Sequence, residues 1–234
     1  MKVEIWSDVV CPFCYIGKRR FEAALRQFAG AGQIEVVWHS FLLDPDLKSD
    51  RKTTPYEYLA ERKGMSLEQS KQMHQQVTDM AKEVGLDYHY ENAIVANSVD
   101  AHRLLQLAKQ HNLGDATKEL LMKAYFIEGK DIASHETLQA IGTQVGLDAQ
   151  LVADTLASDR YLPAVEADVL EAQQIGVRGV PFFVFDRKYA ISGAQPAEAF
   201  LGALQTSFAE WQQTNPAPTL QVQNGSSCEV DGDC

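Results

Sequence analysis

Hydrophobic and polar positions divide the chain into a strand-rich start, a helical middle and a mixed end. Residues 2–7 alternate between polar and apolar side chains, which predicts a strand, and apolar side chains recur at helical spacing over residues 12–29. Residues 34–41 then predict a second strand, long and β-rich enough to be a buried one. The chain therefore opens with a strand, a helix and a strand.

Residues 51–158 carry one helix signal after another and no convincing strand. Ser66 with Gln69 is typical of a helix start, and Gly85 and Gly114 are typical of helix ends. We expect about four to six helices in this block, which makes it a helical subdomain.

The strand pattern returns near the C-terminus. We expect a helix that ends before Gly176, two short strands over 182–185 and 189–192 joined by a charged turn, and a helix from Pro196 to about Trp211. This order predicts an α/β protein with a thioredoxin fold, in which a helical domain is inserted after the second strand.

The same patterns predict the domain organisation. We expect a thioredoxin core formed by residues 1–50 and 159–211, a helical insertion of residues 51–158, and a flexible C-terminal tail of residues 212–234. The first part of the tail has a linker composition rich in Gln, Asn, Pro and Ser, and its end carries two cysteines.

The charge of the chain narrows the classes of partner. Among 234 residues, 21 lysines and arginines stand against 32 aspartates and glutamates, a net charge of −11 at pH 7. Such a field repels phosphate backbones and anionic lipid, so neither nucleic acid nor a membrane is an expected partner. The start has no signal-peptide run and no stretch is apolar enough to span a bilayer, which favours a soluble cytoplasmic protein.

The candidate chemistry lies in Cys11-Pro12-Phe13-Cys14, between the first strand and the first helix. The N-terminus of a helix favours an anion, so we expect the pKa of Cys11 to be lowered and its exposed sulfur to be the nucleophile. Cys14 lies one helical turn on and can attack a mixed disulfide formed at Cys11. The pair therefore predicts two-electron thiol-disulfide exchange, for which no cofactor is expected.

A zinc site is the alternative interpretation of the cysteines, because half of such a site uses the same spacing. Cys228 and Cys234 are the available partners, but the five residues between them are more than usual, and a proline lies inside the first pair. The six histidines show no metal-binding spacing. We therefore expect no metal site.

Val180-Pro181 precedes an apolar strand and, in the expected fold, lies opposite the cysteine loop. We expect a cis bond before Pro181, which turns the backbone of Val180 toward an extended substrate strand. An ordinary trans proline at the start of an edge strand is the alternative. Phe13, inside the loop, is the aromatic side chain that we expect to be exposed to substrate.

Other residues near the cysteines are open to two interpretations. Asp8 can orient the loop or accept a proton during exchange, although an aspartate that only bonds its own backbone explains it equally well. Together with Phe13, the side chains of Trp6, Tyr15 and Phe182 are expected around the cysteines as an apolar platform for unfolded substrate. Core packing explains Trp6 and Phe182 equally well.

Residues 8–17 (DVVCPFCYIG) and 176–184 (GVRGVPFFV) together resemble the DsbA-like thioredoxin family, and within it the FrnE-like cytoplasmic thiol-disulfide oxidoreductases. The likeness covers essentially the whole chain, including the helical insertion. It implies exchange with protein thiols and disulfides, with Cys11 attacking, Cys14 resolving and Pro181 as the cis-proline. Glutathione or a thioredoxin-type protein is the candidate reductant.

Two departures limit what this resemblance implies. Periplasmic members have a histidine where this chain has Phe13, so strong oxidising power does not carry over, and the absence of an export signal argues against a periplasmic role. A sister branch, the hydroxychromene carboxylate isomerases and kappa-class glutathione transferases, has the same fold and typically a serine in place of Cys11. A glutathione-dependent isomerase or transferase for a small molecule is thus the alternative function, and it needs a deep pocket between core and insertion.

The tail carries a second expected redox pair. An Asp-Gly turn signal between Cys228 and Cys234 lets their sulfurs meet at disulfide distance. The linker over residues 212–227, treated as a flexible coil, spans about 20 to 24 Å and can reach the Cys11 face. We hypothesise that this pair exchanges electrons with Cys11 and Cys14. An inert tail and a tail that only buffers metal are the alternatives.

Overall fold

The computed structural model of the chain describes residues 1–216. Within them a sheet of four strands has the order β2-β1-β3-β4, formed by β1 (Lys2–Ser7), β2 (Glu35–Ser40), β3 (Phe182–Phe185) and β4 (Tyr189–Ser192). β1 pairs in parallel with β2 and antiparallel with β3, and Ile5 lies opposite Trp38 on one side and Phe183 on the other. β4 pairs antiparallel with β3.

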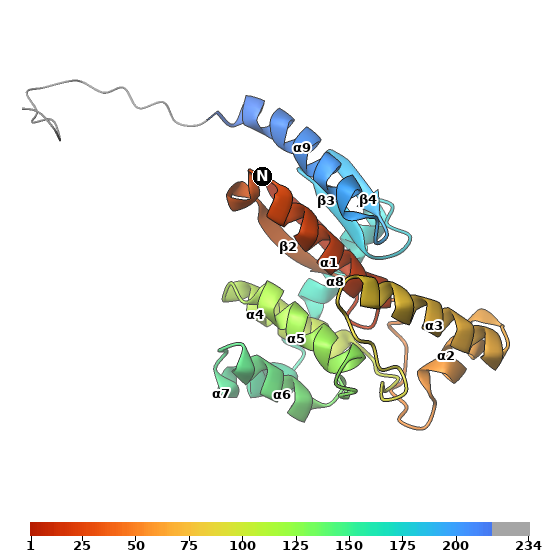
Figure 1. The fold of residues 1–234 in the computed structure, drawn as a ribbon. Coiled ribbons are helices and arrows are strands. Elements are labelled where there is room, and N and C mark those ends of the chain that lie inside the picture. The colour runs from red at the N-terminus through yellow and green to blue at the C-terminus, as the bar shows by residue number, and fades with distance from the viewer. Residues whose placement is uncertain (217–234) are drawn as a thin grey trace, which may run out of the picture.

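The helices of the core follow the expected order. α1 (Pro12–Gln27) and a short 3₁₀ turn η1 (Ala31–Gln33) connect the parallel strands, α8 (Leu162–Gln174) precedes β3, and α9 (Ala197–Thr214) follows β4. In Figure 1, α1 and α9 lie side by side along the sheet. The mixed α/β thioredoxin fold predicted from the sequence is confirmed.

The helices inserted after β2 number six within the described residues: α2 (Pro55–Lys63), α3 (Leu67–Glu83), α4 (Val99–Gln110), α5 (Gly114–Phe126), α6 (His135–Gln144) and α7 (Ala149–Leu156). Figure 1 shows α4 to α7 gathered below the sheet, while α2 and α3 form a hairpin to the right. No helix in the described part of the chain combines the length and apolar character that a membrane crossing requires.

Alternation along the strands sends side chains into two cores. Ile5 of β1 and Phe183 of β3 face α1 and α9, where the ring of Phe183 lies 5.5 Å from that of Phe21 and 4.5 Å from that of Phe200. Trp6, the next residue of β1, packs on the opposite face with Val184 and with Ala172 of α8.

Two details differ from the sequence predictions. β2 is an edge strand and only its second half, from Trp38 to Ser40, is buried, so the prediction of a fully buried strand is wrong. Gly114 begins α5 instead of ending α4, because Asn112, with a φ of 58°, already makes the left-handed turn after α4.

Candidate active site

Cys11 is the N-cap residue of α1, and Pro12 occupies the first helical position, where its missing N–H requires no partner. β1 ends at Ser7, so the loop of three residues that follows delivers Cys11 to the end of the sheet. The backbone N–H of Cys14 donates to the carbonyl oxygen of Cys11 at 3.0 Å. This first turn of α1 holds the two cysteines together.

Pro181 lies opposite the cysteines, as the sequence predicts. The Val180–Pro181 bond is cis, which confirms the expectation, and the Sγ atom of Cys11 lies 3.5 Å from the carbonyl oxygen of Val180. The Pro181 ring also packs against α1, because a Cβ atom on Gly17 would lie 2.9 Å from its Cγ atom. The strand end, the proline and the cysteine pair therefore form one contiguous site.

Both cysteines are buried, which contradicts the expectation of an exposed Cys11. Cys11 is 4% exposed and Cys14 is 1% exposed. A hydrogen bond with the Cys14 side chain, then burial, and then the negative charges of Cys14 and Asp8 raise the pKa of Cys11 well above its ordinary range, although the N–H of Cys14 opposes them. The expected lowering of the pKa of Cys11 by the helix N-terminus is therefore wrong in this dithiol form.

Asp8 orients the loop from a buried position. One carboxylate oxygen accepts from the N–H of Leu43 at 2.8 Å, and the other lies 3.2 Å from Nε2 of His102 and 3.4 Å from the N–H of Val10. Burial alone would raise the pKa of Asp8, but these partners, His102 first, hold it below its ordinary value. Asp8 thus bonds its own loop at Val10 and also ties that loop to Leu43 and His102, while its role as a proton acceptor stays a prediction.

Lys118 of α5 is fully buried beside the same loop. Its Nζ atom donates to the carbonyl oxygen of Ser7 at 3.1 Å and lies 5.7 Å from the centre of the Trp38 ring. Burial lowers the pKa of Lys118 to about 8, and the negative charges of Cys14, Asp8 and Cys11 oppose this lowering. The helical insertion therefore contributes a cation to the surroundings of the dithiol.

The aromatic residues expected around the cysteines have different places. Phe13 is 40% exposed, as predicted, and is the aromatic side chain of the loop that a substrate can touch. Tyr15 is buried, and its hydroxyl donates to Glu119 at 2.6 Å. Trp6 and the half-buried Phe182 pack in the core beneath α8, so the predicted four-residue platform is wrong for them.

A cavity of about 280 Å³ lies in the insertion, lined by residues of α2, α3 and the segment 88–91. Tyr88 forms part of its wall, and the hydroxyl of Tyr88 donates to the carbonyl oxygen of Pro12 at 2.8 Å. The cavity therefore adjoins the cysteine loop, but neither Cys11 nor Cys14 lines it.

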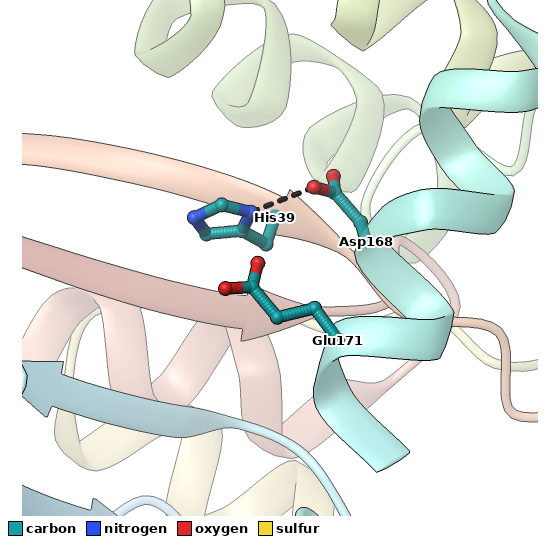
Figure 2. A group of neighbouring side chains, drawn as sticks. All are labelled: His39, Asp168 and Glu171. Atoms are coloured by element: carbon teal, nitrogen blue, oxygen red, sulfur yellow. Dashed lines mark hydrogen bonds and ion pairs between the residues drawn. The ribbon is translucent and has the colours of Figure 1, made fainter. Parts of the chain in front are cut away.

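Figure 2 shows three potential metal ligands close together, His39 of β2 and Asp168 and Glu171 of α8. Nδ1 of His39 is hydrogen-bonded to Asp168 at 2.7 Å, and Glu171 pairs with Arg187 at 2.7 Å. The other oxygen of Asp168 accepts from the N–H of Ser40 at 2.7 Å. These side chains already satisfy one another, so their geometry is that of an ion-pair network and fits a metal ion poorly.

The sequence analysis missed His102, Lys118 and Tyr88. A signal for Lys118 was present, because it stands three residues before Leu121 and four before Met122, on the buried face of α5. His102 likewise stands three residues before the buried Leu105, in a helix, α4, that is buried on almost all sides. Cys228 and Cys234, expected to form a second redox pair, lie outside the described residues.

Comparison with known proteins places this geometry in a family. The model of the DSBA-like thioredoxin domain matches residues 2–205. A structure described as a probable DsbA oxidoreductase, from Streptomyces coelicolor, is 37% identical with a TM-score of 0.83, over 99% of this chain and 97% of its own.

Two further structures are similar in fold alone. A 2-hydroxychromene-2-carboxylate isomerase is 16% identical over 92% of this chain and 98% of its own, with a TM-score of 0.64. The cytosolic disulfide reductase DsbM of Pseudomonas aeruginosa, also solved with GSH, is 16% identical over 92% of this chain and 98% of its own, with a TM-score of 0.60. With a family match over most of its length, and with the cysteine pair and proline arranged as above, the chain belongs to the DSBA-like thioredoxin domain family of oxidoreductases.

Proposed function

We propose that this protein is a thiol-disulfide oxidoreductase that exchanges disulfides with protein substrates through Cys11 and Cys14. The observation that carries the proposal is the position of Cys11, at the N-cap of α1 with its sulfur 3.5 Å from the carbonyl oxygen of Val180. A substrate strand that pairs with the backbone at Val180 brings its own sulfur to Cys11. The exposed ring of Phe13 beside the pair offers apolar contact to such a strand.

The proposed reaction has two steps, written here for a substrate disulfide. The thiolate of Cys11 attacks one substrate sulfur, so that a Cys11–substrate bond forms, the substrate S–S bond breaks, and the released substrate thiolate takes up a proton. The thiolate of Cys14 then attacks the sulfur of Cys11, which forms the Cys11–Cys14 disulfide and releases the second substrate thiolate. Two electrons pass from the dithiol to the substrate, and the reverse sequence oxidises a substrate dithiol.

Cys11 is assigned the attacking role because it lies at the helix edge and is the less buried of the two residues, at 4% exposed against 1%. The test is a trapping experiment on Cys14→Ser, in a background with Cys228→Ser and Cys234→Ser so that no tail thiol competes. Incubation with a disulfide-bearing protein is expected to give mixed disulfides that map to Cys11. Mixed disulfides that instead accumulate through Cys14 in the matching Cys11→Ser variant would contradict the assignment.

The alternative is a glutathione-dependent isomerase or transferase acting on a small molecule. It requires a deep pocket that includes the reacting sulfur. The cavity of about 280 Å³ next to Tyr88 is lined by neither cysteine, which favours protein substrates. The alternative predicts that GSH and an aromatic small molecule bind together without turnover of protein disulfides.

The net direction and the cellular setting complete the proposal. We place the reaction in the cytoplasm with glutathione or a thioredoxin-type protein as reductant, supported by the fold likeness to the cytosolic reductase DsbM. Equilibration with glutathione redox buffers gives the reduction potential of the pair, which decides between reductase, isomerase and oxidase. Comparison of that potential and the turnover rate with those of the Cys228→Ser/Cys234→Ser variant tests the proposed relay to the tail, and identical values would exclude it.

A further inference from the structure

Lys118 is a fully buried cation that lacks a carboxylate partner among residues 1–216. Its Nζ atom donates to a neutral acceptor, the carbonyl oxygen of Ser7. Lys18, the other strongly buried lysine nearby, pairs instead with Glu22, with Asp115 at 3.4 Å and with Glu119 at 3.2 Å. Removing an ammonium group from water without pairing it is strongly unfavourable.

Packing does not account for the charge of Lys118. The contact with the face of Trp38 recovers only part of the lost hydration, and an apolar side chain of the same length would fill the same space without that loss. Buried ionisable groups whose charge is not explained by the fold are candidates for a role in chemistry. The position of Lys118 suggests which chemistry.

The carbonyl that Lys118 contacts belongs to the last residue of β1, directly before the loop that carries Cys11. The negative charges of Cys14, Asp8 and Cys11 raise the pKa of Lys118, and the positive charge of Lys18 lowers it. The charge of Lys118 in turn affects the pKa of His102 in α4. Burial and this cation lower the pKa of His102, which is therefore neutral at pH 7. Asp8 and Lys118 then place charges of opposite sign at the segment that leads from β1 to Cys11.

We propose that Lys118, supplied by the helical insertion, is the counter-charge for the negative charge that thiol-disulfide exchange places on the buried Cys11–Cys14 pair. This inference rests on the proposed function, because each step of exchange begins from a thiolate at one of these sulfurs. When a thiol of the pair loses its proton, Asp8 disfavours the thiolate through its negative charge. The cation of Lys118, held at the carbonyl oxygen of Ser7, opposes that effect.

The test is a pH titration of the thiols, which needs no substrate. In the Cys228→Ser/Cys234→Ser background, thiolate absorbance and the alkylation rate with iodoacetamide are measured for the parent and for Lys118→Met. We expect the lowest thiol pKa to rise by about one unit or more and alkylation at pH 7 to slow about tenfold. The matched control is Lys18→Met, which removes a buried lysine paired with carboxylates and is expected to leave the thiol titration unchanged.

A merely structural role would change the melting temperature of Lys118→Met but leave its thiol titration like that of the parent, and that result would overturn the proposal. Should Lys118→Met fail to fold, lysine-selective NMR on the parent protein replaces it. Because coupling is reciprocal, the pKa of Lys118 is expected to be higher in the reduced protein than in the disulfide form. Equal pKa values of Lys118 in the two forms would also overturn the proposal. A shift in the thiol titration without turnover of protein disulfides would support the role of Lys118 and count against the proposed function.

Discussion

At the scale of single residues, the reactivity of Cys11 depends on two side chains that oppose each other. Asp8 raises the pKa of the Cys11 thiol through its negative charge, and we propose that Lys118, bonded to the carbonyl oxygen of Ser7 before the same loop, opposes it with a positive one. Their distances along the chain from Cys11 are very different, since Asp8 belongs to the same loop and Lys118 to α5 of the insertion. The helix N-terminus is thus only one of several influences on the thiol.

The sign of the Asp8 effect gives a first prediction. Asp8→Asn removes the negative charge and keeps a carbonyl oxygen that can still accept from the N–H of Leu43. We expect the thiol pKa to fall by up to about one unit and alkylation at pH 7 to accelerate accordingly. In the double variant Asp8→Asn/Lys118→Met, the two opposite shifts in thiol pKa should largely cancel. A thiol pKa that rises in Asp8→Asn would show that the carboxylate acts as a proton acceptor rather than as a repelling charge.

Burial of Lys118 gives a second prediction, for stability against pH. Its folded pKa of about 8 lies below the ordinary 10.5, so the unfolded chain binds more protons between these values. The destabilisation by the charged lysine is complete below about pH 8 and is lost as pH rises toward 10.5. Relative to Lys118→Met, wild-type stability should therefore increase by about 3 kcal/mol across this window. Urea denaturation of both reduced proteins measures this, and a difference that stays constant with pH contradicts it.

Sequence reasoning at this scale predicts candidate reacting atoms but not their surroundings. Spacing and context suggest Cys11 and Cys14 because they lie in one local motif, whereas the cis bond at Pro181 is predicted from its place in the expected fold. The upward shift in the pKa of Cys11 depends on Cys14, on burial and on Asp8, and Asp8 is itself held by His102, which reaches the loop from α4. Such long-range contacts leave no local pattern beyond a polar residue on an apolar helix face.

At the scale of elements, α1 needs a glycine where it passes Pro181. A Cβ atom on Gly17 would lie 2.9 Å from a ring carbon of Pro181, closer than a non-bonded contact allows, and the buried proline ring cannot easily move away. α1 can therefore approach the loop before β3 only with no side chain at this position. The residue that permits this contact belongs to the same motif as the cysteines.

This contact gives a third prediction. Gly17→Ala is expected to destabilise the protein by about 1 to 3 kcal/mol and to slow disulfide exchange, because α1 or Pro181 must shift. Gly202→Ala in α9 is the matched control: its Cβ atom would meet nothing within 4 Å, so the higher helix propensity of alanine should stabilise by up to about 1 kcal/mol. Thermal unfolding and insulin reduction measure both. Equal effects of the two substitutions would mean that the close contact between α1 and Pro181 contributes neither to stability nor to disulfide exchange.

Element boundaries follow the sequence where local chemistry decides them. The capping box of Ser66 with Gln69 forms as predicted, because both partners lie within one turn. Gly114 begins α5 and does not end α4, since Asn112 has the left-handed conformation expected of glycine. The prediction for β2 is wrong for a different reason: the strand lies at the edge of the sheet, and no local pattern tells an edge strand from a central one.

At the scale of the whole molecule, Asp168 connects the sheet to the insertion. From α8 it accepts hydrogen bonds from the N–H of Ser40 in β2 and from the side chain of Gln106 in α4. It also bonds to His39 (Figure 2), whose ring stacks on that of Trp6 with 4.4 Å between the ring centres. The cation that approaches Asp168 is Lys109 of α4, at 3.9 Å. The junction that positions α4 and α5 beneath the cysteine loop therefore contains a buried charge.

The last prediction concerns this junction. Asp168→Ala leaves the buried N–H of Ser40 without its acceptor and the amide of Gln106 with only the hydroxyl of Ser40, so we expect a loss of about 2 to 4 kcal/mol at pH 7. Glu171→Ala is the control, because its ion pair with the half-exposed Arg187 is worth about 1 kcal/mol or less. Burial would raise the pKa of Asp168, but His39, Lys109 and the N–H of Ser40 hold it below 3.8.

The pH dependence separates charge from packing at Asp168. The pKa of Asp168 is lower in the folded than in the unfolded protein. Its contribution to the free energy of unfolding is therefore complete above the unfolded pKa of 3.8 and is lost as the pH falls through the folded pKa. The stability difference between wild type and Asp168→Ala should therefore be constant at neutral pH and shrink progressively below about pH 3.8. Urea denaturation at several pH values checks this. A difference that persists unchanged into strong acid would mean that α8 is held to β2 and α4 by packing, and that the buried carboxylate contributes no charge interaction to the junction.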